Sequence, residues 1–123
     1  MTLRERQAAF GIMDAKLVLK ADELGTPIVC LEYLRSVERQ QYLVSIGRSK
    51  TLNSKHIIGL AKDYAFLRDI QDDGKINYRS EKYKTLGEFW ESLGGRWGGR
   101  FGDNLKTEII EGWDCGHYEG LTS

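Results

Sequence analysis

Residues 56–66 read HIIGLAKDYAF, and after His56 this run is apolar except at Gly59, Lys62 and Asp63. A short apolar run is typical of a buried strand, and a glycine within it marks a bend or a close approach of backbone. The sequence therefore predicts a strand over 56–66 that bends near Gly59.

Three helices are predicted from capping signals and helical spacing. The first begins at a capping box over 2–5 and ends at Gly25, and the second spans about 36–46. The third begins at another capping box over 85–88. Its inward-facing residues are expected to be Leu86, Phe89, Trp90 and Leu93.

Further strands are expected at 28–33, 75–78 and 112–119, the first of them buried. Helices come first and then alternate with these strands, and there are no internal repeats. This order predicts an α+β fold with a small, mainly antiparallel sheet and flanking helices. A chain of 123 residues fits one compact core, so we expect a single domain over 1–123.

Composition excludes several partners. Eighteen basic residues balance eighteen acidic ones, which favours neither a nucleic acid nor a membrane surface. No apolar run approaches the roughly 20 residues that a membrane span needs. Residues 1–7 are polar where a secretory signal needs an apolar stretch, so we expect cytosolic synthesis.

Cys30 and Cys115 match no cysteine-based zinc site and are expected to be buried free thiols, although one bridge between them is possible.

The two histidines of the chain, His56 and His117, lie among glycines and acidic residues instead of on an apolar face. Two imidazoles and one carboxylate are a standard ligand set for catalytic zinc, which keeps a fourth position for water. Asp63 follows His56 by seven residues, and Asp114 precedes His117 by three, with a glycine inside each interval. Either histidine taken alone is more often a structural residue, so the spacing leaves both interpretations open.

Two motifs carry a family resemblance. Residues 54–63 fit S-x-H-x-x-G-x-A-x-D, and residues 114–117 fit D-x-x-H. Together they resemble the M15 peptidases, which include D-alanyl-D-alanine carboxypeptidases and the L-alanyl-D-glutamate endopeptidases of phage endolysins. The resemblance extends over about 32–119, most of the chain.

This resemblance implies roles for particular residues. His56, Asp63 and His117 would hold one zinc ion, and Asp114 would be the general base. Asp at that position resembles the endopeptidases, whereas the dipeptidases typically have Glu. Three further residues would contact the substrate: Arg35, Gln40 and Ser54. The segment after the second motif, 117–119, resembles the H-F-E ending of phage members.

Some features depart from the family or have a simpler explanation. Leu34 stands where the family often has Tyr before the arginine, and Arg35 could instead pair with Glu32 or Glu38 on the surface. Cys115 is expected to be a small spacer, since a fourth protein ligand would close the metal site. The acidic turn over 69–74 fails the spacing of a calcium loop. The tryptophans are expected in the core, with a substrate groove as the alternative: Trp90, Trp97 and Trp113.

The function expected from the resemblance is zinc-dependent hydrolysis of the L-Ala–D-Glu bond in the peptidoglycan stem peptide, by a monomeric phage-type endolysin. Such an enzyme would be made in the cytoplasm of the host cell and reach the cell wall through a holin-type membrane hole. One alternative keeps the chemistry and releases terminal D-Ala as a carboxypeptidase or dipeptidase. Another is an inactive, zinc-stabilised wall-binding or virion protein.

Overall fold

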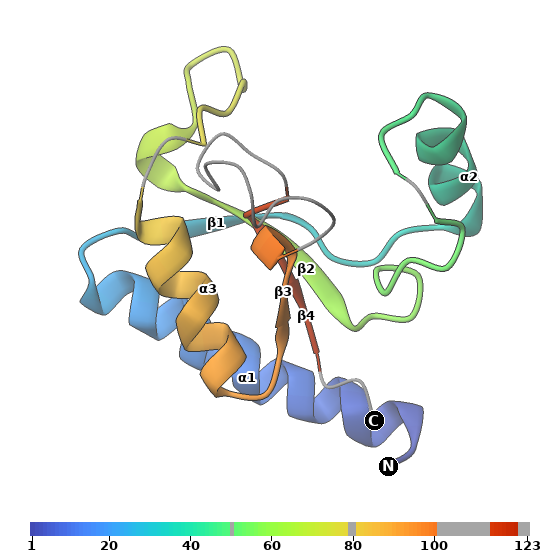
Figure 1. Ribbon diagram of the computed structural model, residues 1–123, viewed down its shortest axis with the longest axis horizontal. Helices are drawn as coiled ribbons and strands as arrows, with labels where there is room; N and C mark the ends of the chain where they lie inside the picture. The colour runs from blue at the N-terminus through green and yellow to red at the C-terminus, as the bar shows by residue number, and fades with distance from the viewer. Residues whose placement is uncertain (50, 79–80, 101–113, 121–123) are drawn as a thin grey trace.

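The computed structural model of the protein describes residues 1–49, 51–78, 81–100 and 114–120 (Figure 1). Within these ranges the fold is α+β, as predicted. The elements are α1 (Leu3–Glu23), β1 (Ile28–Glu32), α2 (Val37–Ser45), β2 (Ala61–Phe66), η1 (Leu67–Asp69), α3 (Lys82–Ser92), β3 (Arg96–Trp97), η2 (Gly98–Arg100) and β4 (His117–Glu119).

The described strands form one four-stranded sheet in the order β1-β2-β4-β3, and every pairing is antiparallel. The last strand in sequence therefore lies inside the sheet, between β2 and the short β3. Its register places Asp63 of β2 directly opposite His117 of β4. Sheet topology thus joins two segments that are more than fifty residues apart in the chain.

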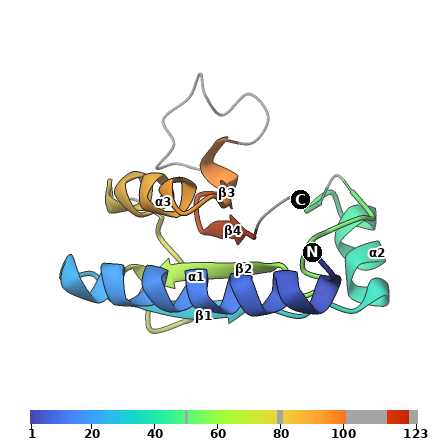
Figure 2. The ribbon, with the colours of Figure 1, turned by 90° about the horizontal axis from the view of Figure 1, so that it is seen from below.

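Helices α1 and α3 pack on one face of the sheet, whereas α2 stands at the end opposite α3 (Figures 1 and 2). Because side chains alternate along a strand, Tyr64 and Phe66 share the helix-covered face with Tyr118. Asp63 and His117 consequently point to the other face. None of the described helices combines the length and apolar character needed to cross a bilayer.

The core lies between the two helices and the sheet. Its largest members are fully buried, and Trp90 and Trp97 are among them. Each indole N–H donates to a backbone carbonyl near the chain end, Trp90 to Glu119 and Trp97 to Cys115, both at 2.7 Å. The core expectation is therefore confirmed for Trp90 and Trp97, and Trp113 lies outside the described residues.

The first helix begins as predicted. The Thr2 hydroxyl accepts from the amide of Glu5, and the Glu5 carboxylate accepts from the amide of Thr2. The predicted start of the third helix is wrong, because α3 begins at Lys82 and has no side-chain cap. Thr85 lies inside that helix, where packing of Tyr83 and Leu86 in the core extends it by a turn.

Three strand predictions need correction. β2 begins at Ala61, and residues 55–59 before it form turns, with a positive φ of 67° at Gly59. β1 is an edge strand with exposed residues instead of a buried strand. Residues 75–78 form no strand but a single bridge between Ile70 and Ile76. The predicted strand over 112–119 is described only from 114, and β4 occupies its end.

Candidate metal centre

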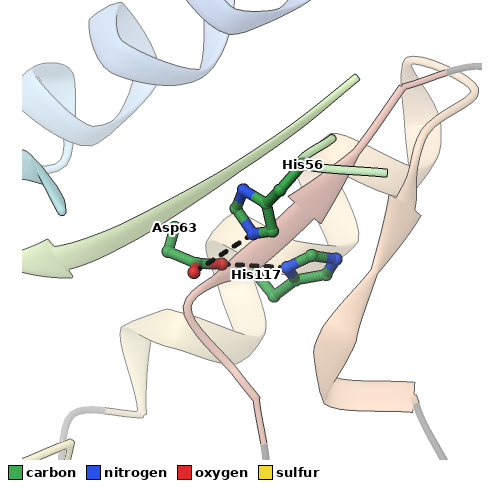
Figure 3. Close-up of side chains that lie close together, drawn as sticks. All are labelled: His56, Asp63 and His117. Atoms are coloured by element: carbon green, nitrogen blue, oxygen red, sulfur yellow. Dashed lines mark hydrogen bonds and ion pairs between the residues drawn. The ribbon is translucent and has the colours of Figure 1, made fainter. Parts of the chain in front are cut away.

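His56, Asp63 and His117 converge on one point beside the sheet (Figure 3). Each offers one ligand atom, and these atoms all lie within 4.8 Å of one another. Asp63 Oδ1 is 2.8 Å from Nδ1 of His117, and Asp63 Oδ2 is 3.2 Å from Nε2 of His56. The structure therefore brings together the three residues predicted as metal ligands.

His56 is oriented by the turn that precedes β2. Its backbone N–H donates to the Ser54 hydroxyl at 3.2 Å, and its ring Nδ1 lies 2.9 Å from the Tyr33 carbonyl oxygen. Because a carbonyl oxygen can only accept, Nδ1 carries the hydrogen in this contact. The lone pair of the neutral ring is then at Nε2, the nitrogen that faces Asp63.

This arrangement leaves a polar atom without a hydrogen bond. His56 is 1% exposed, and its Nε2 is buried with no hydrogen-bond partner despite the nearby Asp63 oxygen. A lone pair and a carboxylate oxygen repel each other unless a cation lies between them. Two imidazoles and a carboxylate suit zinc, and the 24% exposed Asp63 side chain leaves one side open to solvent. The residues present therefore fit a zinc ion with an open position.

His117 is fixed from both sides of its ring. Nδ1 contacts Asp63, and Nε2 lies 3.1 Å from Glu119 Oε1. Burial acts to lower the pKa of His117, but the hydrogen bonds to Asp63 and Glu119 outweigh it and raise the pKa to about 10. The ring therefore sits in a strongly negative environment, which also favours a metal cation.

The same contacts shift the pKa of Asp63 in the opposite direction, downward. Burial acts to raise its pKa, yet the hydrogen bond with His117 and the close contact with His56 hold the pKa well below its usual value. The carboxylate is consequently ionised near neutral pH, as a metal ligand must be.

Asp114 stands just before β4 with a positive φ of 36°, a conformation that few residues other than glycine adopt. The positive φ is thus at Asp114 and not at Gly116, the glycine between Asp114 and His117. Gly116 is needed for a different reason, since a Cβ there would lie 2.2 Å from the Tyr64 carbonyl oxygen. His117 N–H donates to the Asp114 carbonyl at 3.0 Å, which closes the turn.

The Asp114 carboxylate is close enough to the centre to interact electrostatically with His117, Asp63 and His56. The residue keeps an exposed surface, but protein packed around its carboxyl group desolvates the charge and raises its pKa. A carboxyl group with a raised pKa beside a metal site is suited to accept and return a proton. Its role as general base stays a prediction.

Arg35 reaches the centre through a network that includes both other predicted substrate contacts. Its guanidinium donates to Glu32 at 2.6 Å and to Gln40 at 2.8 Å, and lies 3.5 Å from the Ser54 hydroxyl. A further guanidinium nitrogen lies 3.6 Å from Asp63 Oδ2. The expected alternative, an ion pair with Glu32, therefore exists together with an approach to the centre.

Gln40 is fully buried and its amide is already occupied. Its nitrogen donates to the Ser49 hydroxyl at 2.8 Å and to the Thr51 carbonyl at 2.5 Å, while its oxygen accepts from Arg35. In this structure Gln40 orients Arg35. Contact with substrate stays a prediction, and for Gln40 it requires an exchange of these partners.

Sequence reasoning missed two groups that orient the histidines. Glu119 follows His117 by two residues, a spacing that places both side chains on one face of a strand, so a signal was present. The Tyr33 carbonyl that orients His56 is a backbone group, and no sequence pattern marks it.

The glycine-rich segment 96–102 follows α3 and approaches the centre closely at Gly98. A Cβ at Gly98 would lie 2.3 Å from the Asp114 carbonyl oxygen and 2.7 Å from the His117 Cβ. Only a residue without a side chain fits there. The rest of that segment, 101–102, lies outside the described residues.

The two cysteines are free. Cys115 is buried, as expected, whereas Cys30 is exposed on the edge strand, which corrects the expectation that both are buried. Cys115 is not part of the group that gathers around Asp63.

Three comparisons show which known proteins this chain is similar to. The sequence profile of the D-alanyl-D-alanine carboxypeptidase family, a branch of the M15 peptidases, matches residues 47–108. The L-alanyl-D-glutamate peptidase of Listeria phage A118 is 33% identical over 84 residues, which are 68% of this chain. The chain spans only 30% of the length of that relative.

Solved structures show the same fold. The Serratia marcescens L-Ala D-Glu endopeptidase ChiX is 25% identical, with a TM-score of 0.56 over 78% of this chain and 68% of its own. The LD-carboxypeptidase LdcB is 15% identical, with a TM-score of 0.62 over 92% of this chain and 57% of its own. The D,D-pentapeptidase VanY, in complex with Zn(II), is 15% identical, with a TM-score of 0.56 over 91% and 70%.

The profile match includes the first motif and half of the chain, and it confirms the resemblance inferred from the sequence. The chain belongs to the M15 peptidase family.

Proposed function

We propose that this protein is a zinc-dependent peptidase that hydrolyses a peptide bond in the peptidoglycan stem. The observation that carries the proposal is the convergence of His56, Asp63 and His117, with the buried Nε2 of His56 left without a hydrogen bond. A catalytic zinc site needs three protein ligands and an open position. The grouping of these three side chains and the partial exposure of Asp63 support such a site.

The bond that we propose is the one between L-Ala and D-Glu. Two relatives support this choice by their own activities, the phage A118 peptidase at 33% identity and the Serratia endopeptidase at 25%. Asp at position 114, as in the endopeptidases that the chain resembles, supports it further. The similarity to the phage A118 peptidase also supports a phage-type lysis enzyme that acts on the cell wall of the host. That it acts as a monomer stays a prediction.

The chemistry divides among the residues of the centre. When bound, zinc supplies a Lewis acid that polarises the scissile carbonyl and lowers the pKa of a water molecule. Asp114 would accept a proton from the attacking water and later deliver it to the leaving amine. Its raised pKa and its exposed surface suit this exchange, because the carboxyl must both take up and release the proton.

Arg35 would hold the negative charge that develops on the substrate. The Arg35 side chain is 9% exposed and its guanidinium is fixed by Glu32 and Gln40, so little reorganisation would accompany the reaction. The hydrogen bond that Nδ1–H of His56 donates to the Tyr33 carbonyl, together with the turn that precedes β2, would hold His56 in place while substrate binds.

The test is digestion of purified cell walls by the zinc-loaded protein, followed by turbidity and by mass spectrometry of the released peptides. New amino-terminal D-Glu on stem peptides, abolished by a chelator and restored by zinc, supports the proposal. Release of free D-Ala would support the carboxypeptidase alternative, which the description of the matching family favours. A zinc-loaded protein that binds walls without releasing any peptide would contradict both enzyme assignments.

A further inference from the structure

We propose that Glu119 is a positioning residue that makes Nδ1 of His117, and not Nε2, the atom that binds the metal. This inference rests on the proposed zinc site and assigns a function to a residue outside its three ligands. The geometry begins with β4, where His117 and Glu119 are two residues apart and therefore point to the same face.

The contact between the two side chains determines the tautomer. Glu119 Oε1 lies 3.1 Å from Nε2 of His117. Nδ1 lies 2.8 Å from Asp63 and faces the centre, and both carboxylates can only accept. When a metal binds Asp63 and replaces the hydrogen on Nδ1, the ring keeps its hydrogen on Nε2, where Glu119 accepts it. Glu119 thus selects the nitrogen and fixes the plane of the ring.

Glu119 is itself held firmly. Its Cα is paired with Ala61 on one side and Arg96 on the other, and its carbonyl accepts from the Trp90 indole at 2.7 Å. The residue is 8% exposed, so its carboxylate cannot swing into solvent. A carboxylate fixed in this way orients an imidazole more strictly than a mobile surface group would.

The charge of Glu119 has few other partners among the described residues. Oε2 is buried without a hydrogen bond; the exposed Arg96 forms an ion pair with it at 3.7 Å, and Lys55 interacts with the carboxylate electrostatically. A buried carboxylate is costly unless a positive group opposes it. A metal-bound imidazole is such a group, because it donates a more strongly polarised N–H. The placement of Glu119 therefore matches a loaded centre.

His56 presents the other ring nitrogen, Nε2, to the centre. Nδ1 of His56 faces the Tyr33 carbonyl, which leaves Nε2 toward Asp63. The two rings thus present different nitrogens, and each remaining nitrogen has its own acceptor. A backbone carbonyl orients His56, whereas a side chain orients His117. Only the contact that orients His117 can therefore be removed by substitution.

The experiment uses the whole chain and combines nitrogen NMR with zinc affinity. In the zinc-loaded wild type, long-range proton–nitrogen correlations are expected to show a hydrogen on Nε2 of His117 and none on Nδ1. A chelator competition then gives the dissociation constant for zinc. Glu119→Ala is expected to weaken zinc binding by about 10- to 100-fold, the usual effect of removing such an orienting partner.

Two variants separate orientation from simple loss of an acid. Glu119→Gln keeps an oxygen that accepts from Nε2–H, and it is expected to retain most of the affinity that Glu119→Ala loses. Glu91→Gln is the control, because it removes a carboxylate on α3 that pairs with Arg100 at 3.2 Å. This variant is expected to bind zinc as the wild type does.

Each result decides one question. Zinc on Nε2 of His117, or wild-type affinity in a folded Glu119→Ala protein, would overturn the role of Glu119 and leave the zinc site intact. A wild-type protein that binds no zinc would overturn the proposed zinc site and this inference with it. The NMR measurement needs no variant, so it remains decisive if Glu119→Ala does not fold.

Discussion

Asp63 and His117 face each other across neighbouring antiparallel strands, and their side chains meet at 2.8 Å. Directly opposite residues in such a pair share one face of the sheet, so the backbone ladder between β2 and β4 fixes their separation. His56 joins them from the turn that precedes β2. The pairing of β2 with β4 therefore contributes to the stability of the sheet and also sets the geometry of the centre.

Asp114→Asn is expected to abolish most hydrolysis without loss of zinc. Asparagine has nearly the same shape and tolerates a positive φ, so the turn at 36° should persist while the proton acceptor is lost. A fall in kcat of about 100- to 10,000-fold is typical for loss of a general base. Cell-wall digestion measures the loss of hydrolysis, and metal analysis of the same preparation measures the retained zinc. Retained activity would refute the role of Asp114 as general base.

Gly98→Ala is expected to disturb the centre from a distance. The new Cβ would meet the Asp114 carbonyl oxygen at 2.3 Å and the His117 Cβ at 2.7 Å, so β4 or η2 must move. Overpacking of this kind costs about 1–3 kcal/mol of unfolding free energy, and zinc affinity should fall with it. Thermal unfolding and chelator competition measure the two effects.

Gly11→Ala is the matched control for that substitution. Gly11 lies in α1, and a Cβ there meets nothing within 4 Å. Alanine in a helix interior is expected to raise the unfolding free energy by about 0.5–1 kcal/mol and to leave zinc binding unchanged. If the two alanine variants had the same unfolding free energy and the same zinc affinity, the space around Gly98 would not be limiting.

The pair of Glu32 and Arg35 is expected to contribute to acid unfolding. The hydrogen bond from Arg35 holds the pKa of Glu32 below its usual value, so the pair stabilises the folded state above that value. This stability is lost as the pH falls through the lowered pKa. In metal-free protein, Glu32→Gln should therefore reduce the drop in Tm between about pH 5 and pH 3.

A control on α1 tests whether that effect is specific. Glu23 is a largely exposed carboxylate, 3.8 Å from Lys20 and remote from the centre. Glu23→Gln is expected to keep the acid dependence of the wild type, because exposed pairs contribute little. A Glu32→Gln protein with the same acid dependence would mean that the Arg35 network does not depend on its charge.

The two thiols should differ in reactivity. Desolvation raises the pKa of both thiols, but Cys30 is exposed on β1, whereas Cys115 is buried and its pKa rises to about 12. A disulfide reagent at about pH 8 is expected to label one thiol in the native protein and both after unfolding, because the thiolate is the reactive form. Mass spectrometry identifies the labelled residue, and rapid native labelling of Cys115 would contradict its burial.

Much of the fold was accessible from sequence because local signals and packing agree. The capping box at Thr2 starts α1, and its buried residues Phe10, Met13 and Leu17 recur at helical spacing. The start of α3 was wrong because core contacts of Tyr83 outweigh the capping signal at Thr85. Burial of β1 was also wrong, since an apolar run alone does not reveal that a strand lies at the sheet edge.

The site was predicted better than the elements that carry it. The two motifs named the three residues that converge, although β2 begins after His56 and the bend lies in a turn. Sequence could not show that Gln40 is buried beneath Arg35, because that contact depends on how α2 is placed. Nor could it show which ring nitrogen of each histidine faces the centre.

The most direct test of the account is the metal content of the purified protein, measured by mass spectrometry of the elements after dialysis against zinc. We expect about one zinc per chain in the wild type and almost none in His56→Ala or Asp63→Asn, since three ligands are needed to hold the ion. Glu91→Gln should keep the full content. A folded wild-type protein without zinc, or variants that retain it, would contradict the proposed centre.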